Sequence, residues 1–521
     1  MNQVGWWLED AARRAPDSQL APLFAPAEAR SLAEVVAAAR RVAGGLAAHG
    51  VRPGDVVGVM LPNSLDFAVI ALGVLGSGAV LAPLAVPFGR ATARATEIVR
   101  DAGIRHVIAR AGTTVGTAAM IAPALVMAGP DTAPAALDPD ARALVQYTSG
   151  STARPKGVAL THRQLLAGVD AIVTGARITR DDRWCTWLPM THDMGFIGIL
   201  VCIQAGAAID FTTPATFVKR PDEWLAAFAA RGGTLYAGPC SSYRLLLEAI
   251  ADPAALDLRR WRIAFNGAEQ IDAGVIERFA RTFAPAGFRS TAMFPVYGLA
   301  EATLAVTFPS GASAPRIAWV DRALLMRKRL ARDRTGDGAR GVVGVGRPVP
   351  GLAVRIAGGV PERHVGEIEI RGPSVMTGYY REVTPSVRDG WLPTGDLGFL
   401  DRGELFVTGR TKEVMKLNGE SYFPEDVEAL VRACAGVRRC VALAVVRDER
   451  EAMTVLVEAE RGDDAALGTT IRRAVAAGLG LAVEVARVER GAILVTTSGK
   501  YQRLAMRDLY ERGELATRIL E

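Results

Sequence analysis

PDEWLAAFAARGGTLYAGPCSSYRLLLEAIAD, from Pro221 to Asp252, alternates helical and extended patterns. Pro221-Asp222 is typical of a helix start, and Gly232-Gly233 of a helix end. The run TLYAGP then predicts a strand, SSYRLLLEAIAD a second helix, and RRWRIAFN, which ends at Asn266, another strand. Because helices and apolar strands alternate, the sequence predicts an α/β fold with layered, mostly parallel sheets that helices cover on both faces.

The loops after these strands are the expected ligand-binding positions, since ligands of such sheets bind where the strands run out into loops. They contain Gly238-Pro239, Asn266 to Glu269, and Tyr297-Gly298. Further along, a Gly-rich, basic stretch from about Ser310 to Gly346 is predicted to be a surface excursion between sub-domains.

Length and composition favour a large globular protein. The chain has 521 residues, of which 50% are hydrophobic, enough for a large core with a second domain attached. Its five cysteines form no CxxC pair and no His/Cys cluster, so we expect reduced thiols in a cytoplasmic protein and no zinc site. The N-terminus lacks a basic region followed by an apolar core, so no signal peptide is expected.

One segment, Phe67 to Phe88, is long and uncharged enough to resemble a membrane span. Its glycines and prolines divide it, however, into a short helix that opens near Asn63-Ser64 and a following strand. We therefore expect a buried helix-to-strand unit and no membrane-spanning segment.

The charge distribution argues against a nucleic-acid partner. The net charge is +6, but the basic residues are spread along the chain, and the densest run is MRKRLARDR, from Met326 to Arg334. A weakly basic surface would equally suit an acidic protein partner.

Lysine is rare in this chain. Only six of the 61 basic residues are lysines, so each is a candidate for a role that needs a compact ammonium group on a flexible stem. Four of them lie in Gly-rich motifs, namely Lys156, Lys412, Lys416 and Lys500, whereas Lys219 and Lys328 are expected to be ordinary surface residues.

The loop YTSGSTARPKGVALTH, from Tyr147 to His162, has the composition of a phosphate cradle. Gly150 and Gly157 allow backbone turns that other residues resist, and Lys156 adds a positive charge. Further donors come from the backbone amides and from four hydroxyl groups, those of Thr148, Ser149, Ser151 and Thr152. The loop differs from the phosphate loop of NTPases, because a proline precedes the lysine and no Ser or Thr follows it.

This loop and six further motifs resemble the acyl-adenylate-forming (AMP-binding) superfamily, and they occur in the family's order over nearly the whole chain. The six motifs are NGAE (Asn266 to Glu269), YGLAE (Tyr297 to Glu301), GEIEIRGPSVMTGYY (Gly366 to Tyr380), WLPTGDLG (Trp391 to Gly398), GELFVTGRTKEVMKLNGESYFPEDVE (Gly403 to Glu428) and TTSGK (Thr496 to Lys500). Three segments, namely WLPMTHDMGFIG (Trp187 to Gly198), NGAE and YGLAE, resemble the fatty acyl-AMP ligases more than amino-acid adenylation domains.

The resemblance implies a two-step reaction with ATP and Mg²⁺. A carboxylic acid, here a fatty acid, would react with ATP to give acyl-AMP and pyrophosphate. The acyl group would then pass to a thiol, either the phosphopantetheine arm of an acyl carrier protein or coenzyme A. Three alternatives stay open: an acyl-CoA synthetase, an amino-acid adenylation enzyme, and a relative that binds acyl groups or nucleotides without catalysis.

By the same resemblance, the nucleotide site can be assigned residue by residue. Lys500 would contact both the substrate carboxylate and the α-phosphate, and Glu301 would hold Mg²⁺, a cation that prefers carboxylate and phosphate oxygens. Asp396, with Arg410 beside it, would accept from the ribose hydroxyls, and Tyr297 would stack on adenine. The remaining nucleotide-binding candidates are Thr148, Ser149, Gly150, Ser151, Thr152, Lys156, Asn266, Gly267, Ala268, Glu269 and Gly298.

The acyl pocket is expected around the HDMG segment. His192 is a candidate catalytic residue, as a gate or anion contact near the carboxylate. Asp193 lies about where amino-acid-activating relatives keep an aspartate for the substrate ammonium, but HDMG as a whole follows the ligase pattern, so we expect an uncharged acyl substrate. The substrate-binding candidates are His192, Asp193, Met194, Gly195, Tyr236, Gly238 and Ser241.

The resemblance also implies a large domain, residues 1–411, and a small, mobile α+β lid, residues 412–521. Lys412 would be the hinge, and rotation of the lid after adenylation would withdraw Lys500. Three departures from the ligase pattern bear on the second step and on the phosphate loop, the first being Glu420 and Ser421 where the ligases commonly show Arg-Asn. Only Arg381 to Gly390 separate GYY from WLPTGDLG, where the ligases usually carry an insertion, and Ala153 replaces an expected glycine.

Overall fold

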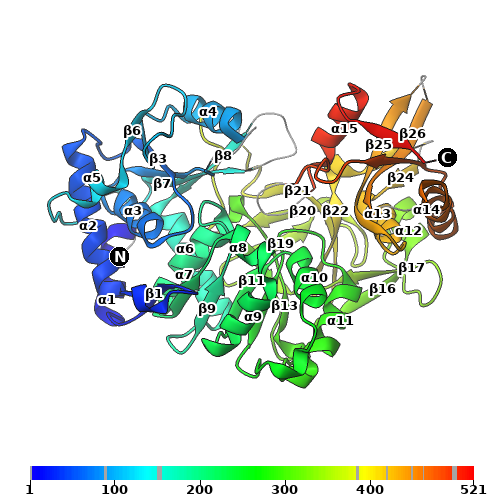
Figure 1. The fold of residues 1–521 in the computed structure, drawn as a ribbon, viewed down its shortest axis with the longest axis horizontal. Helices are drawn as coiled ribbons and strands as arrows, with labels where there is room; N and C mark the ends of the chain where they lie inside the picture. Colours follow the sequence, from blue (N-terminus) through cyan, green and yellow to red (C-terminus); the bar gives the residue numbers. More distant parts are fainter. Residues whose placement is uncertain are drawn as a thin grey trace.

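The computed structural model describes residues 3–86, 91–148, 155–382, 386–417, 420–447, 450–460, 463–495 and 501–520. The chain forms two helix-flanked sheets rich in parallel pairs, several smaller antiparallel sheets, and a C-terminal unit of strands and helices (Figure 1). The α/β class predicted from the sequence is confirmed.

The first large sheet has six strands in the order β6-β5-β3-β4-β7-β8. Its pairs are parallel except β7 with β8, whose antiparallel pairing brings Thr148 opposite Lys156. The strands are β3 (Val56–Met60), β4 (Val80–Pro83), β5 (His106–Ala109), β6 (Ala119–Ile121), β7 (Arg142–Thr148) and β8 (Lys156–Thr161). The accompanying helices are α2 (Leu32–Ala48), α3 (Leu65–Gly76), α4 (Ala91–Ala102) and α5 (Pro123–Met127).

The second large sheet has seven strands in the order β13-β12-β11-β9-β10-β1-β2, and only β1 with β2 is antiparallel. The strands are β1 (Gln19–Pro22), β2 (Arg30–Ser31), β9 (Arg183–Thr186), β10 (Ala208–Phe211), β11 (Leu235–Gly238), β12 (Ile263–Asn266) and β13 (Met293–Pro295). The helices are α1 (Val4–Arg14), α6 (His162–Ala176), α7 (Asp193–Ala205), α8 (Pro214–Lys219), α9 (Pro221–Ala230), α10 (Cys240–Ala249) and α11 (Ala273–Phe283). The predicted order of helix, strand, helix and strand after Pro221 is confirmed by α9, β11, α10 and β12.

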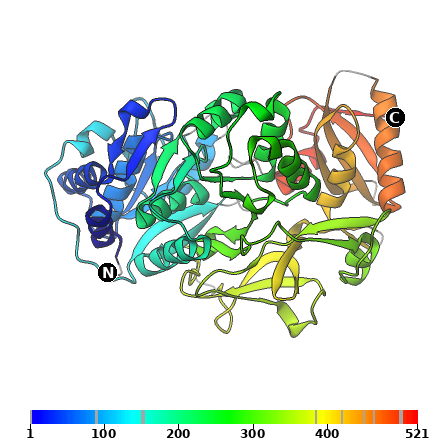
Figure 2. The same cartoon turned by 90° about the horizontal axis from the view of Figure 1, so that it is seen from below.

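Smaller antiparallel sheets follow the second large sheet along the chain (Figure 2). One contains β14 (Tyr297–Leu299), β15 (Leu304–Phe308) and β18 (Arg347–Pro348). Another contains β19 (Ala353–Ile356), β20 (Gly366–Arg371), β21 (Leu392–Asp401) and β22 (Glu404–Arg410). They place the YGLAE and TGDLG motifs on strands and their ends.

The stretch from Ser310 to Gly346 is more than the surface excursion that its basic, Gly-rich composition predicted. It contains β16 (Ile317–Asp321), α12 (Arg322–Lys328) and β17 (Ala339–Val343), with β16 and β17 paired. Val320 and Leu325 are completely buried, in one hydrophobic cluster with residues of the C-terminal unit. The prediction was wrong because short apolar runs within the stretch pack against hydrophobic residues far along the chain.

The C-terminal unit is built around the sheet β25-β26-β27-β28 and lies on the right of Figure 1. Its strands are β23 (Met415–Leu417), β24 (Glu420–Tyr422), β25 (Val437–Arg447), β26 (Arg450–Ala459), β27 (Glu484–Val488) and β28 (Thr517–Ile519). Its helices are α13 (Pro424–Arg432), α14 (Asp464–Leu479) and α15 (Arg503–Glu511). It contacts the preceding part of the chain through a buried ion pair, with 3.0 Å between Arg340 Nη1 and Asp426 Oδ2.

The apolar segment that begins at Phe67 forms α3, which Ser64 caps, followed by β4, as predicted. Within the described ranges, no helix is both long enough and apolar enough to cross a membrane.

Candidate active site

A cavity of about 1450 Å³ is walled by residues from both the strand ends and the C-terminal unit. The predicted residues on its wall are Thr148, Lys156, His192, Asp193, Met194, Ser241, Ala268, Glu269, Tyr297, Gly298, Glu301, Asp396, Arg410 and Lys412. The fold therefore gathers residues that are up to about half the chain apart in sequence around one space.

Asp396 is held by two neighbours. Tyr297 donates from its hydroxyl to Oδ2 across 2.7 Å, and Arg410 Nε lies 3.0 Å from Oδ1. The pairing of β21 with β22 sets Asp396 directly opposite Arg410, and the negative charge of Asp396 raises the pKa of Arg410. Since a carboxylate has about four acceptor positions, Asp396 keeps capacity for two further hydroxyl donors.

Glu301 lies in a negatively charged, partly desolvated environment. Burial raises the pKa of its carboxyl, and the nearby charges of Asp193 and Asp396 raise it further, while Tyr379 donates from its hydroxyl to Oε1 across 2.8 Å. A cation beside Glu301 would offset these three negative charges. The described residues hold no cluster of three or more His, Cys, Asp or Glu side chains suited to a metal. Mg²⁺ commonly uses one or two carboxylates plus substrate phosphates, so Glu301 fits that cation.

The structure describes only the two ends of the phosphate loop. Ser149, Gly150, Ser151 and Thr152, together with Ala153, lie outside the described residues. Thr148 receives a hydrogen bond from Arg94 Nη2 to its carbonyl oxygen, across 3.0 Å. Lys156 Nζ lies 2.9 Å from Glu382 Oε1 and 4.5 Å from the centroid of the Tyr379 ring. The β7–β8 hairpin thus sets a cationic group beside the Glu301 and Tyr379 pair.

The NGAE segment divides into a buried half and a cavity-facing half. Asn266 is completely buried, and neither polar atom of its side chain has a partner among the described residues. Together with Gly267 it lies behind the cavity wall. Ala268 has φ of 70°, a left-handed conformation that is uncommon for alanine and that clusters at functional sites. Glu269 Oε1 accepts from Ser241 N across 2.6 Å, and burial raises the pKa of Glu269.

The predicted acyl-pocket residues also separate into two groups. His192, Asp193, Met194 and Ser241 line the cavity, with 2.5 Å between His192 Nδ1 and Asp193 Oδ1. Among the described residues, the other three lie behind the wall, namely Gly195, Tyr236 and Gly238. Tyr236 supports the wall, because its hydroxyl donates to Ser242 Oγ across 2.7 Å and accepts from Trp187 Nε1 across 3.0 Å.

Lys412 lies in the short helix η7 (Thr411–Glu413), on the cavity wall. Lys500 lies outside the described residues, but Val495 and Tyr501 on either side of its segment both line the cavity. Arg503, at the start of α15, pairs with Glu413 at 2.5 Å and with Glu428 at 2.9 Å. This contact joins the beginning of α15 to the residue that follows Lys412.

Sequence reasoning missed several residues that shape the site, because their partners are distant in the chain. The main ones are Arg94, Tyr379, Glu382 and Arg503. Of these four residues, Tyr379 alone had a feature in the sequence that pointed to the site, because it lies in the GYY motif. Nothing in the sequence marked Arg94 or Glu382.

The comparisons with known proteins agree with this geometry. The family model described as AMP-binding enzyme matches residues 8–380. The long-chain-fatty-acid–AMP ligase FadD26 of Mycobacterium marinum is 31% identical over 543 residues, covering 93% of this chain and 92% of that protein. The medium-chain-fatty-acid–[acyl-carrier-protein] ligase JamA of Moorena producens is 34% identical over 410 residues, covering 73% of this chain and 69% of that protein.

A solved structure from a study of fatty acyl-adenylate ligases from E. coli and L. pneumophila superposes with a TM-score of 0.90. It is 27% identical, and the match covers 97% of this chain and 98% of that one. The chain therefore belongs to the AMP-binding enzyme family, and it is similar over nearly its whole length to the fatty acyl-AMP ligases within it.

Proposed function

We propose that this enzyme joins a fatty acid to AMP, with release of pyrophosphate, and then passes the acyl group to the phosphopantetheine thiol of an acyl carrier protein. The observation that carries the proposal is the continuity of one cavity. It runs from the polar group around Asp396, Arg410 and Glu301 to apolar side chains along α7. Such a space suits a nucleotide and an alkyl chain whose reacting ends meet.

The polar residues would position ATP for attack by the carboxylate. Asp396 would accept from the ribose hydroxyls, while Lys156 and the phosphate loop would bind the phosphates that leave. Mg²⁺, when held by Glu301, would offset the phosphate charge. Lys500 would contact the substrate carboxylate and the α-phosphate, so that two anions can approach in line.

The surroundings of Asp193 support an uncharged acyl chain over an amino acid. Asp193 Oδ1 already accepts from its neighbour Met194 N across 2.7 Å and lies 2.5 Å from His192 Nδ1. Both contacts use Oδ1, and the cavity beyond Asp193 is walled by apolar side chains along α7, which suit an uncharged acyl chain.

The choice of a carrier protein rests on similarity to relatives such as JamA, whose name states an acyl-carrier-protein ligase activity. Residues 1–411 would form the adenylating domain and residues 412–521 the lid, with the hinge at Lys412. We place the enzyme in the cytoplasm, because all five cysteines are free and buried.

The test is a product analysis with ATP, Mg²⁺ and acids from hexanoic to hexadecanoic. Acyl-AMP, acyl-CoA and acyl-carrier protein are quantified by mass spectrometry, with coenzyme A or a phosphopantetheinylated carrier protein as acceptor. Acyl-AMP that persists with coenzyme A and disappears with the carrier supports the proposal. Efficient acyl-CoA formation would make the enzyme an acyl-CoA synthetase, and an amino acid as the preferred substrate would overturn the fatty-acid assignment.

A further inference from the structure

One face of helix α7 lines the cavity along most of its length. Met194, Gly198, Val201 and Cys202 are all on the cavity wall, and their spacing places them on the same side of the helix. From Met194 to Cys202 an α-helix advances about 12 Å. The cavity therefore continues for roughly this distance away from His192 and Asp193, which lie at the beginning of the helix.

The walls of this channel are apolar. Besides α7, they are formed by side chains from α6, β9, β11 and β15, including Ile172, Trp184, Leu235 and Phe308. Bonds of about 1.5 Å in a zigzag advance about 1.25 Å per carbon, so the channel suits about ten methylene groups. Its length and polarity thus match a straight alkyl chain.

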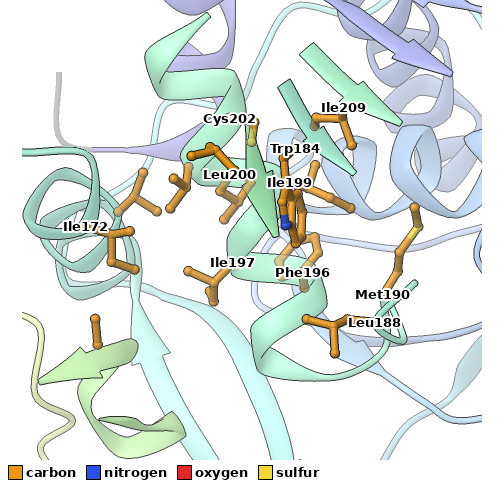
Figure 3. Packing of buried hydrophobic residues seen from close by; sticks show 14 of the residues in the cluster. Ile172, Trp184, Leu188, Met190, Phe196, Ile197, Ile199, Leu200, Cys202 and Ile209 are labelled. Atoms are coloured by element: carbon orange, nitrogen blue, oxygen red, sulfur yellow. The ribbon is translucent and has the colours of Figure 1, made fainter. Parts of the chain in front are cut away.

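One close contact, between Trp184 and Gly198, lies midway along the channel. A methyl group added at Gly198 would lie only 2.1 Å from the outer ring edge of Trp184, at Cη2. The indole ring therefore lies directly on the helix backbone, and Trp184 is only 4% exposed. Figure 3 labels Trp184 together with the α7 residues Phe196, Ile199 and Cys202, which belong to the same buried hydrophobic cluster. Because Gly198 has no side chain, the ring can lie back against the helix and leave the channel open.

We propose that the contact between Trp184 and Gly198 sets which acyl chains pass to the far end of the channel at Cys202. The inference rests on the proposed function and names its substrate class, unbranched alkyl acids of medium length. A side chain at position 198 would push the indole ring into the channel, so a long chain would be stopped where a short one still fits. A smaller residue at position 184 would admit a wider chain.

The test compares kcat/KM for decanoic and hexanoic acid, from pyrophosphate release, in wild type, Gly198→Ala, Trp184→Ala and the double variant. Gly198→Ala should lower the decanoic-to-hexanoic ratio by at least about tenfold, the lower end of the discrimination that one methylene group gives in an apolar pocket. The double variant should recover the wild-type ratio to within about twofold, because the blocking ring is gone. Trp184→Ala alone should gain activity with an acid that carries a phenyl ring at its chain end.

A matched control is Gly73→Ala in α3, a helical glycine whose added methyl would lie 2.5 Å from Val42 Cβ. It should lower the thermal stability without changing the ratio. An unchanged ratio in Gly198→Ala, or a double variant that stays as impaired as Gly198→Ala, would overturn the inference while the wild-type activity still supports the proposed function. If Gly198→Ala does not fold, failure of Trp184→Ala to accept the phenyl acid overturns it. Wild type without pyrophosphate release on any acid would overturn both.

Discussion

Tyr379 donates a hydrogen bond from its hydroxyl to Oε1 of Glu301 across 2.8 Å, although 78 residues separate the two in sequence. The bond fixes the carboxylate that we assign to Mg²⁺, and Lys156 lies over the same tyrosine ring. Tyr379 therefore links the metal-binding candidate to the end of the phosphate loop.

Tyr379→Phe should raise the Mg²⁺ concentration needed for half-maximal pyrophosphate release by about tenfold. A hydrogen bond to a charged group contributes about 1.5 kcal/mol or more, and its loss frees the carboxylate to rotate. Tyr380→Phe is the matched control, since Tyr380 contacts Arg142 and Arg381 through its ring. Equal Mg²⁺ requirements in the two variants would contradict the assignment of Glu301.

The dependence on Mg²⁺ should also change with pH. Burial raises the pKa of Glu301, so its carboxylate takes up a proton at a higher pH than an ordinary glutamate does. Because only the ionised form binds the cation well, Mg²⁺ affinity should fall as the pH drops through this raised pKa. Titrations at a series of pH values should show this fall in wild type and a flat, weak response in Glu301→Gln. An identical pH response in the variant would exclude Glu301 as its source.

Tyr297→Phe should weaken ATP binding by about tenfold, because Asp396 loses one of the two neighbours that orient it. Asp396→Asn should weaken ATP binding more than Tyr297→Phe does. The loss of affinity should be smaller when ATP is replaced by an analogue without ribose hydroxyls. Binding is measured by calorimetry without the acid. A penalty that is the same for both nucleotides would show that Asp396 does not hold the ribose.

Arg340→Met should destabilise the protein by about 3 to 5 kcal/mol, because it leaves Asp426 buried without its partner. The double variant Arg340→Met, Asp426→Leu should recover most of the lost free energy of unfolding, which is measured by urea unfolding. Burial raises the pKa of Asp426, whereas the charge of Arg340 lowers it. Removing Arg340 should therefore raise the pKa of Asp426 further. The deficit of the single variant should then shrink as the pH falls and Asp426 becomes neutral. A deficit independent of pH would mean that the lost stability lies in packing.

Lys412→Pro tests the proposed hinge. Proline removes the N–H of residue 412 and biases Thr411 towards an extended conformation, so it should favour one orientation of the lid over the other. Adenylation, measured as pyrophosphate exchange, and thioester formation should then fall by different factors. Equal loss of both would count against a hinge at this position.

The sequence predicted the parts of this protein that depend on local patterns. The alternation of helix and strand after Pro221 and the division of the apolar segment at Phe67 follow from periodicity and from glycine and proline positions, and both are confirmed. The motifs predicted which residues surround the cavity. These residues come together because the carboxyl ends of parallel strands meet at one edge of a sheet.

Contacts between distant segments could not be read from the sequence. Nothing local indicates that Arg340 meets Asp426, or that Val320 is buried against the C-terminal unit. Similarly, Tyr236 and Gly238 lie in the expected pocket strand, β11, but behind the cavity wall, since which residues of a strand face a cavity depends on packing across the sheet. The channel along α7 could be recognised only from the positions of Trp184 and Gly198 in the structure.

Fatty-acid adenylation assisted by Lys500 is tested most directly by ATP–pyrophosphate exchange with decanoic acid in wild type and in Lys500→Ala, with the acyl-AMP product identified by mass spectrometry. Exchange should depend on decanoic acid, and it should fall by about 10² to 10³ in the variant, the usual cost of removing a preorganised electrostatic contact. Exchange that is equal in the two proteins, or a wild type that forms no acyl-AMP from any acid in the series, would contradict this assignment.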